Sequence, residues 1–372
     1  LDLFDGNIYN YPCLHSDGIL NFKVALKPAG SKLLYISQRK LHGQQRALEK
    51  WNGEGETIGD SEVVASVLDD NVINLDYCKL IMEGDTSEKV YYYQAQEEVF
   101  RAHGFDKNPW SMAIQYGNEI ANKDTFSRGS GFKAVYPFLI DSEFKTKDIR
   151  VVVESPELYE VTCNGEKLEQ QEGEWWLDKG FGVYEIHGGI EAGMNEVAIE
   201  ANPMSVYAEL APVYLVGDFD VLPVDEGWLL ATKVDRGVGS WRQMGLPFYS
   251  GRVEYTTTID SVGMGVPVKL SLERWEGTVA RVEVNGNLTG HVFSPPYEIR
   301  LDNLLISGEN TVSVIVYGSL KNLLGPHHNV NRRGIVTPWD FKTAPEDQPS
   351  GNAYDLLDYG LMEPFQVLIL SS

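Results

Sequence analysis

Apolar and polar residues alternate with a period of two along most of this chain. Each alternating segment is short and ends at Gly, Asn or Pro, which are residues that favour turns. Clear examples lie at residues 147–155, 193–201, 251–260, 266–275, 278–286 and 310–318. Short strands separated by turns at intervals of about 8–12 residues are typical of β-sandwiches. The pattern therefore predicts an all-β protein built from antiparallel sandwiches.

Helical periodicity is clearest in one segment, residues 92–103 (YYQAQEEVFRAH), where Val99 and Phe100 lie on one side. Gly104 follows directly and is a natural helix stop. We expect one short helix there, inserted between strands.

An internal repeat indicates two copies of one sandwich in tandem. In each copy a strand ends in an Asn-Gly pair, at Asn164 and again at Asn285. A Gly-x-Asn turn then precedes another strand, with its Asn at position 195 in the first copy and 310 in the second. Asn-Gly is the preferred pair for a type I′ hairpin turn, because both central residues need positive φ.

The repeat sets the expected domain boundaries. Residues 1–64 are predicted to form a β unit and a glycine-rich linker, which includes the NGEGETIG segment. The first sandwich, with the helical insertion, takes residues 65–219, and the second takes residues 220–372. The last segment, 363–372 (EPFQVLILSS), is almost wholly apolar, which predicts a central and buried strand.

Charge and cysteine content exclude several classes of function. The 372 residues carry 31 basic and 54 acidic side chains, a net charge of −23, and this field repels nucleic acid and anionic membrane surfaces. Cys78 and Cys163 lie in strand-like segments and are expected to be buried, and with Cys13 they form neither a disulfide framework nor a zinc signature. The chain begins at Leu1 without an initiator Met or a signal peptide, which we interpret as a processed product or a piece of a longer protein.

No catalytic motif is present. The sequence has no G-x-S-x-G elbow, phosphate loop or dinucleotide fingerprint. Adjacent acids such as Asp69-Asp70 are expected from composition alone, and we predict no catalytic residue and no cofactor. His327 and His328 are adjacent rather than four residues apart on a helix, which argues against a metal site. A structural calcium ion is compatible with the fold, but the sequence does not place one.

Sugar-binding sites typically contain aromatic rings that stack on a pyranose and polar groups that form hydrogen bonds with its hydroxyls. The candidate ligand-binding residues are Trp241, Tyr249, Trp275, Tyr297, His327, His328, Arg332 and Trp339. Each aromatic residue could equally cover the core. The polar segment 318–341, which holds both histidines and Arg332, is expected at one end of the second sandwich, with contact to a partner domain slightly favoured over contact to sugar. Trp175-Trp176 is expected to turn one ring to the core and the other outward, for domain packing.

Three stretches, 245–259, 279–319 and 322–328 (NLLGPHH), resemble the C-terminal galactose-binding-like jelly rolls of large bacterial glycoside hydrolases. The resemblance is to the family two sugar-binding sandwich and to accessory domains of family one hundred and six α-L-rhamnosidases. Residues 2–37 look like the β unit that follows the catalytic barrel in such enzymes. In that family the catalytic carboxylates lie on the barrel, whereas this sequence has no βαβ alternation.

The resemblance implies a non-catalytic β-sandwich region of a glycoside hydrolase. Its expected partners are an N-terminal catalytic barrel, as a domain or a subunit, and an oligo- or polysaccharide. Two alternatives stay open: a stand-alone carbohydrate-binding protein, and a glycosidase with its own carboxylate pair. Relatives of this kind are often periplasmic or exported, so the resemblance weakly favours a bacterial protein outside the cytoplasm.

Overall fold

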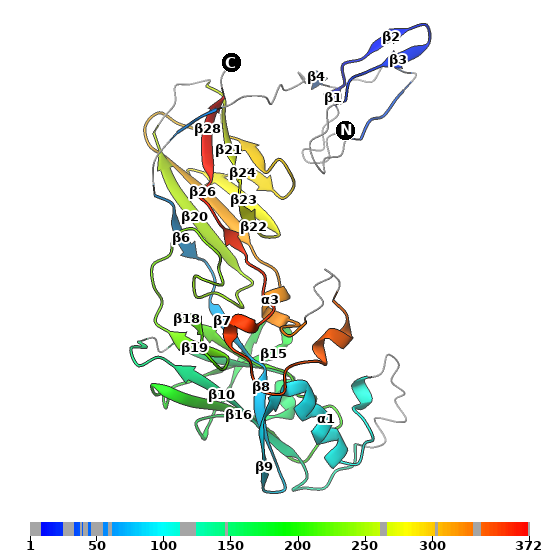
Figure 1. Cartoon of the computed structure of the whole chain (residues 1–372), viewed down its shortest axis with the longest axis vertical. Helices are drawn as coiled ribbons and strands as arrows, with labels where there is room; N and C mark the ends of the chain where they lie inside the picture. The colour runs from blue at the N-terminus through cyan, green and yellow to red at the C-terminus, as the bar shows by residue number, and fades with distance from the viewer. Residues whose placement is uncertain are drawn as a thin grey trace. The chain divides into compact units, whose positions relative to one another are not determined.

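The computed structural model describes residues 9–24, 33–37, 39, 44–45, 55–58, 62–111, 124–145, 148–260, 266–301, 304–329 and 336–370 (Figure 1). These residues confirm the predicted all-β, sandwich-like class: antiparallel sheets dominate, and the two α-helices are α1 (Tyr92–Ala102) and α3 (Lys321–Leu324). Neither described helix is long and apolar enough to cross a membrane.

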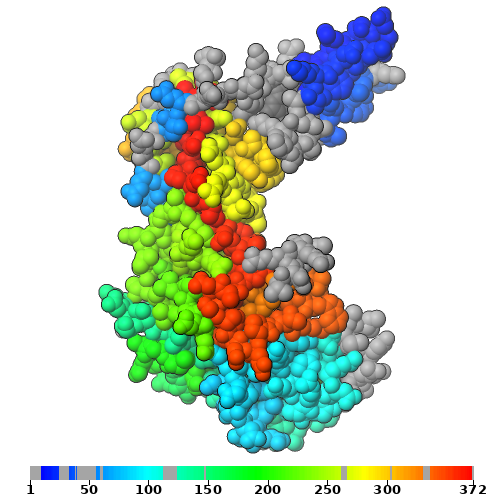
Figure 2. Space-filling view, in the orientation of Figure 1, coloured from blue at the N-terminus to red at the C-terminus, as the bar shows by residue number. Residues whose placement is uncertain are grey.

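The chain divides into two compact units that do not follow chain order. The large unit comprises Ser66–Val253 and Tyr317–Gly360. The small unit comprises Glu254–Val316 and Leu361–Ser372, together with the residues before Ser66. Figure 2 shows the surface of the described residues, coloured along the chain.

The large unit contains two sheets. The first has eight strands in the order β13-β12-β16-β10-β19-β18, with β8 also paired to β10 and β9 paired to β8. Its strands are β8 (Tyr77–Met82), β9 (Asp85–Tyr91), β10 (Phe132–Ile140), β12 (Glu160–Cys163), β13 (Glu166–Lys167), β16 (Gly193–Ala201), β18 (Asp220–Pro223) and β19 (Trp228–Ala231). The second has the order β14-β15-β11-β17-β7. Its strands are β7 (Asn71–Leu75), β11 (Ile149–Glu154), β14 (Gln170–Trp176), β15 (Asp178–Glu185) and β17 (Val213–Gly217).

One apolar core fills the large unit. Alternate residues of β10, such as Tyr136 and Phe138, and residues of β11, such as Val151, belong to it. Helix α1 adds Val99 and Phe100, both with no exposed surface. Gly104, at φ +85°, follows this helix as expected. Both the predicted helix and the predicted buried state of Cys78 and Cys163 are therefore confirmed.

The small unit is built on a five-stranded sheet, β24-β23-β26-β20-β6, and a four-stranded sheet, β25-β21-β28-β5. The five strands are β6 (Val64–Val67), β20 (Arg252–Ile259), β23 (Val279–Val284), β24 (Asn287–Val292) and β26 (Asn310–Tyr317). The four strands are β5 (Gly55–Thr57), β21 (Val268–Ser271), β25 (Glu298–Arg300) and β28 (Gln366–Leu370). Every second residue of β23 is buried, as alternation predicts for a half-buried sheet. The remaining short strands are β1 (Tyr9–Asn10), β2 (Leu14–Ser16), β3 (Ile19–Asn21), β4 (Gln44–Gln45), β22 (Trp275–Glu276) and β27 (Gly360–Leu361).

The predicted repeat corresponds to a hydrogen-bonded pair of asparagines in each unit. In the large unit Asn164 donates from Nδ2 to Asn195 Oδ1 at 2.8 Å. Asn195 Oδ1 also accepts from the Glu191 N–H, and its Nδ2 donates to the Glu191 and Gly193 carbonyls. Asn164 Oδ1 accepts from the Glu196 N–H at 2.9 Å. Two side chains thereby fasten an Asn-Gly hairpin to the start of β16.

The small unit contains a second copy of these contacts. Asn285 Nδ2 donates to Asn310 Oδ1 at 2.9 Å, and Asn310 bonds the N–H and carbonyl of Ile306 and the carbonyl of Gly308. Asn285 Oδ1 accepts from the Thr311 N–H at 3.0 Å. Asn164 and Asn285 both have positive φ, 46° and 52°, and the glycine after each does too, as the type I′ prediction requires.

Three expectations about organisation differ from the structure. Segments 220–253 and 317–360, expected in the second sandwich, both belong to the large unit. The linker expected at residues 52–59 contains strand β5, which pairs with β28. Strand β28 lies between β21 and β5 in its sheet, as a central strand should, but Val367 is its only buried residue, so the expected full burial is wrong.

Because Asn195 and Asn310 each satisfy three backbone groups and are at most 2% exposed, we expect each Asn→Ala variant to lose at least about 2 kcal/mol of unfolding free energy. Thermal unfolding followed by circular dichroism measures this loss. The matched control is Asn287→Ala, an exposed asparagine beside the second turn. Equal midpoints for Asn287→Ala, Asn195→Ala and Asn310→Ala would contradict the structural role of the pairs.

Candidate functional site

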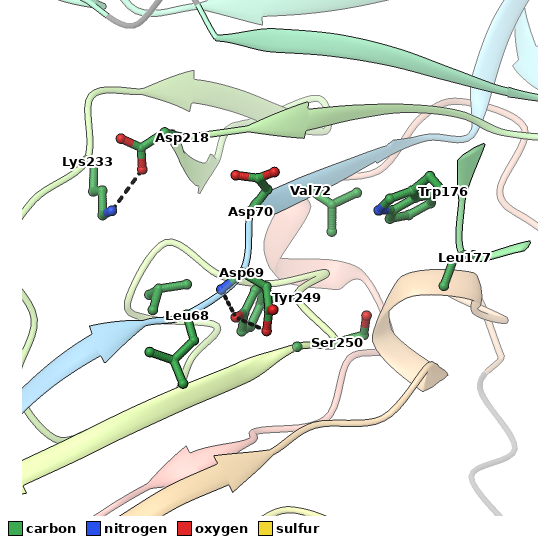
Figure 3. Close-up of a pocket in the computed structure, with 12 residues that line it drawn as sticks. Leu68, Asp69, Asp70, Val72, Trp176, Leu177, Asp218, Lys233, Tyr249 and Ser250 are labelled. Atoms are coloured by element: carbon green, nitrogen blue, oxygen red, sulfur yellow. Dashed lines mark hydrogen bonds and ion pairs between the residues drawn. The ribbon is translucent and has the colours of Figure 1, made fainter. Parts of the chain in front are cut away.

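A pocket of about 580 Å³ opens at one end of the large unit's sheets (Figure 3). Its volume lies in the range of about 300–1,000 Å³ typical of small-molecule sites. The lining comes from connections between strands and from the ends of β6, β7 and β14: Val67, Leu68, Asp69, Asp70, Val72, Trp176, Leu177, Asp218, Lys233, Tyr249, Ser250 and Gly251. We refer to it below as the aspartate pocket.

Asp69 lies in the connection from β6 to β7 and is held in a fixed orientation. Its carboxylate accepts two hydrogen bonds from the Arg252 guanidinium, at 2.7 and 3.1 Å, and one from the Arg252 N–H at 3.0 Å. The bonds from Arg252 lower the pKa of Asp69 below its usual value. Asp69 is therefore an ionised group with a fixed place in the wall.

Tyr249 stands behind this carboxylate. Its hydroxyl donates to the Arg252 carbonyl at 2.8 Å and accepts from the N–H groups of Arg252 and Asp69, at 2.9 and 3.1 Å. Burial raises the pKa of the phenol, which stays protonated. The hydroxyl is thus engaged in positioning the loop rather than available to a ligand.

Asp70 and Asp218 face each other across the end of a strand pair. In the antiparallel register of β7 and β17, Asn71 lies opposite Gly217, so Asp70 and Asp218 are the next positions outward. Like charges at directly opposite positions are destabilising. Each carboxylate is paired with a cation: Arg150 bonds Asp70 and also lies 3.7 Å from Asp148, and Lys233 Nζ bonds Asp218 Oδ1 at 2.8 Å.

The opposite wall is apolar. Trp176 and Leu177 form the sharp turn between β14 and β15, where Leu177 has φ +60°. Trp176 is half-buried against the rings of Phe181 and Tyr214, whereas the preceding Trp175 is 53% exposed. This outcome matches the expectation that the two rings face opposite ways. In Figure 3 Asp70 lies between the Asp218–Lys233 pair and Trp176.

Buried polar contacts fix the connections that carry these groups. Asn71 Nδ2 donates to the carbonyls of Phe219 and Gly245, each at 2.8 Å. Asp220 and Arg236 form an ion pair in which both side chains are at most 4% exposed. The loops before β7 and after β17 are consequently tied to the core within two residues of Asp70 and Asp218.

The structure moves two predicted sugar-binding residues into the core. Trp241 is 1% exposed and packs against the rings of Tyr249 and Tyr359, with Gly318 and Gly360 close to its ring. Tyr249 lines the aspartate pocket, but its side chain is also 1% exposed. Neither ring presents a face on which a pyranose could stack, so the prediction of stacking is wrong for both.

The other predicted aromatic residues lie apart from the pocket's lining. Trp275 and Tyr297, in the small unit, form an edge-to-face pair with ring centroids 5.5 Å apart, and both are partly exposed. Trp339 is 69% exposed, with Lys342 Nζ 4.1 Å from its ring centroid. Their role in sugar binding stays a prediction. Arg332 lies outside the described residues.

Both predicted histidines are structural anchors in the large unit. His328 Nε2 lies 2.9 Å from Asp76 Oδ2, and the Tyr354 hydroxyl donates to Asp76 Oδ1 at 2.8 Å. His327 Nε2 donates to the Asn322 carbonyl at 2.7 Å, and its side chain is buried. The prediction that either imidazole meets a sugar is wrong for these positions, because both rings are enclosed by protein.

Of the residues that line the aspartate pocket, Tyr249 is a candidate predicted from the sequence, whereas the charged residues are not. Adjacent acids such as Asp69 and Asp70 are expected from composition alone, and no motif marks Asp218 or Lys233. One feature of the sequence does point to this site: Asp69-Asp70 directly precedes the apolar strand β7, and Asp218 directly follows the apolar strand β17. Acids at both ends of a strand pair meet when the strands are antiparallel neighbours.

Two other carboxyl groups stand out electrostatically. Burial raises the pKa of Glu154 and of Glu209, and Asp178 adds to the effect at Glu154. Neither lines the aspartate pocket. No group of three or more His, Cys, Asp or Glu side chains that could hold a metal ion occurs within the described parts of the chain.

Comparison with known proteins gave no matching family model and no matching curated protein. Among solved structures, the chain is similar to a rhamnosidase from Novosphingobium sp. PP1Y, with 15% identity and a TM-score of 0.27 over 65% of this chain and 23% of that one. It is similar to a Streptomyces avermitilis α-L-rhamnosidase, with 11% identity and a TM-score of 0.27 over 70% and 25%. A β-D-mannosidase from Dictyoglomus thermophilum gives 10% identity and a TM-score of 0.25 over 67% and 31%. The matched region spans less than a third of each of these three glycosidases.

The buried His327 predicts a pH dependence of stability. Burial lowers its pKa from 6.5 to about 4; Asp76 opposes the shift, and Lys321 and His328 add to it. As pH falls, the unfolded chain therefore takes up this proton first, and stability is lost from about pH 6.5 down to about pH 4, by about 3 kcal/mol. Thermal unfolding between pH 7 and pH 4 measures the loss.

His327→Gln keeps an N–H donor for the Asn322 carbonyl but does not titrate in this range. We expect its stability to fall less with pH than that of the wild type, whereas His187→Gln, at an exposed position, should follow the wild type. Parallel pH profiles for the wild type and His327→Gln would show that the buried imidazole does not titrate as the structure indicates.

Proposed function

We propose that this chain is a non-catalytic β-sandwich region of a glycoside hydrolase, which packs on a catalytic barrel and contacts the carbohydrate substrate. In this role the large unit presents the aspartate pocket to the glycan, and the barrel supplies the catalytic carboxylates. The proposal keeps the function implied by the sequence resemblance but moves the sugar contact from the predicted aromatic residues to the aspartate pocket.

The observation that carries the proposal is the state of the pocket's three carboxylates. Asp69 is paired with Arg252, Asp70 with Arg150 and Asp218 with Lys233. A glycosidase acid needs a raised pKa so that it holds a proton near neutral pH. Arg252 instead lowers the pKa of Asp69. Ion-paired carboxylates are suited to accepting hydrogen bonds from hydroxyls, which is a binding role.

The architecture of the small unit supports the same assignment. The stretch that resembles the sugar-binding sandwich, 279–319, forms β23, β24, β25 and β26. Its Asn285–Asn310 network is a second copy of the Asn164–Asn195 network. Two like sandwich motifs in one chain favour a tandem accessory region over a single self-contained domain.

The first expected outcome is that the chain alone does not hydrolyse a panel of aryl α- and β-glycosides, assayed by release of the chromogenic phenol. Glu154 and Glu209, whose pKa values burial raises, are the best-placed alternative acids. Turnover that disappears in Glu154→Gln or Glu209→Gln would overturn the proposal in favour of a glycosidase with its own carboxylates.

A second expected outcome concerns glycan contact. In affinity electrophoresis the folded chain should migrate more slowly in native gels that contain its target neutral polysaccharide than in gels without it. Bovine serum albumin provides the non-binding reference in the same lanes. Unchanged mobility across a panel of galactans, mannans, xylans and rhamnose-rich polysaccharides would remove the carbohydrate contact from the proposal.

A further inference from the structure

The aspartate pocket leaves specific polar atoms available to a ligand. Arg150 bonds Asp70 through Oδ2, and Lys233 bonds Asp218 through Oδ1. Within the described residues, Asp70 Oδ1 and Asp218 Oδ2 have no hydrogen-bond partner. Lys233 Nζ has three donor positions and uses one on Asp218. Asp70, Asp218 and Lys233 are each about half exposed, with side-chain exposures of 44%, 58% and 44%.

These atoms form a donor and acceptor set for neighbouring hydroxyl groups. A sugar hydroxyl both donates and accepts, so one hydroxyl can donate to Asp218 Oδ2 and accept from Lys233 Nζ. The register of β7 and β17 ends at Asn71 and Gly217, so Asp70 and Asp218 are the next positions outward, and side chains at opposite positions lie about 5 Å apart. A second hydroxyl on the adjacent ring carbon can then donate to Asp70 Oδ1.

The charges in and around the pocket select a neutral ligand. The carboxylates of Asp69, Asp70 and Asp218 are each paired with a cation, Arg252, Arg150 and Lys233 respectively, and Arg150 also lies 3.7 Å from Asp148. Each of the three pocket carboxylates already bonds a cation, which a divalent metal ion would have to displace. The net charge of −23 on the chain repels an anionic sugar such as a uronate. A neutral polyol is not repelled by the negative charge of the chain and does not need to displace a cation from the pocket.

The apolar wall gives such a ligand an orientation. Val72, Trp176 and Leu177 line the pocket opposite the ion pairs (Figure 3). A pyranose has hydroxyl groups at its rim and patches of C–H groups on its faces, so it can bond the charged wall while its C–H groups contact the apolar wall. A linear anion or a hydrated metal ion has no surface that matches this wall.

We propose that the aspartate pocket binds a neutral pyranose residue through two adjacent hydroxyl groups, held by Asp70, Asp218 and Lys233. The inference rests on the proposed function and adds the ligand class and the residues. Asp69, Arg252 and Tyr249 are positioning residues, because they fix the loop that carries Asp70. Trp176 and Leu177 supply the apolar wall.

The test measures binding of the full chain to defined probes by saturation-transfer NMR and titration calorimetry. The neutral probes are methyl α-D-mannopyranoside, methyl β-D-galactopyranoside and methyl α-L-rhamnopyranoside; the charged probes are methyl β-D-glucuronide and calcium chloride. We expect at least one neutral glycoside to bind, and the glucuronide and Ca²⁺ to bind at least tenfold more weakly.

Pocket variants then locate the site. Asp218→Asn and Lys233→Met should each weaken binding of the neutral probe at least tenfold, and the double variant Asp70→Asn/Asp218→Asn should abolish it. The matched control is an exposed ion pair elsewhere in the large unit, Lys167–Glu160, at 2.7 Å. Lys167→Met and Glu160→Gln should leave binding unchanged. Equal thermal midpoints confirm that a loss reflects binding rather than folding.

The outcomes separate this inference from the proposed function. If neutral sugars bind but the pocket variants bind as well as the wild type, or only Trp339→Ala loses binding, the pocket assignment is overturned and the proposed function stands. Preference for the glucuronide or for Ca²⁺ overturns the neutral ligand. No binding of any neutral probe or polysaccharide overturns both the pocket assignment and the proposed glycan contact. Glycoside turnover by the chain overturns the proposed function alone.

Discussion

The buried carboxylate of Asp76 is the constraint on which the large unit depends. Its side chain is 1% exposed, and a carboxyl group at such a depth is tolerated only with direct hydrogen-bond partners. Both partners, His328 and Tyr354, come from segment 317–360. The strands before and after that segment, β26 and β28, belong to sheets of the small unit. The hydrogen bonds to Asp76 therefore help to hold segment 317–360 in the large unit.

The same strand links this anchor to the aspartate pocket. Strand β7 is only five residues long, and Asp76 follows its last residue whereas Asp70 precedes its first. All five residues of β7 are buried, and the strand pairs with β17 over its whole length. A shift of register by one residue would turn Asn71 and Asn74 away from their backbone partners. The anchor at one end of β7 and the ion pairs at the other are thus positioned by a single register.

Local features of the sequence predicted local structure well. The period-two segments became β11, β16, β20, β21, β23 and β26, because alternation records which face of a strand is buried. The Asn-Gly pairs predicted their turns, since few other residues accept positive φ at two consecutive positions. Local sequence features do not predict that segment 317–360 belongs to the large unit, and they do not predict the aspartate pocket. The placement of this segment and the pocket depend on pairs such as Asp76–His328 and Asp69–Arg252, which are 252 and 183 residues apart, and no periodicity encodes such partners.

Two aromatic residues that were predicted to bind sugar, Trp241 and Tyr249, are buried instead. Trp241 and Tyr249 are among the largest side chains in the chain, and burying each removes much apolar surface from water. Their rings serve the core of the large unit, where Gly318 and Gly360 leave room beside Trp241. Charged side chains are retained at the end of the sheets, where solvent lowers the cost of ionisation and neighbouring cations cancel their repulsion. The large rings of Trp241 and Tyr249 are therefore buried in the core. The groups that can bond a polar ligand are the ion-paired side chains at the ends of the strands.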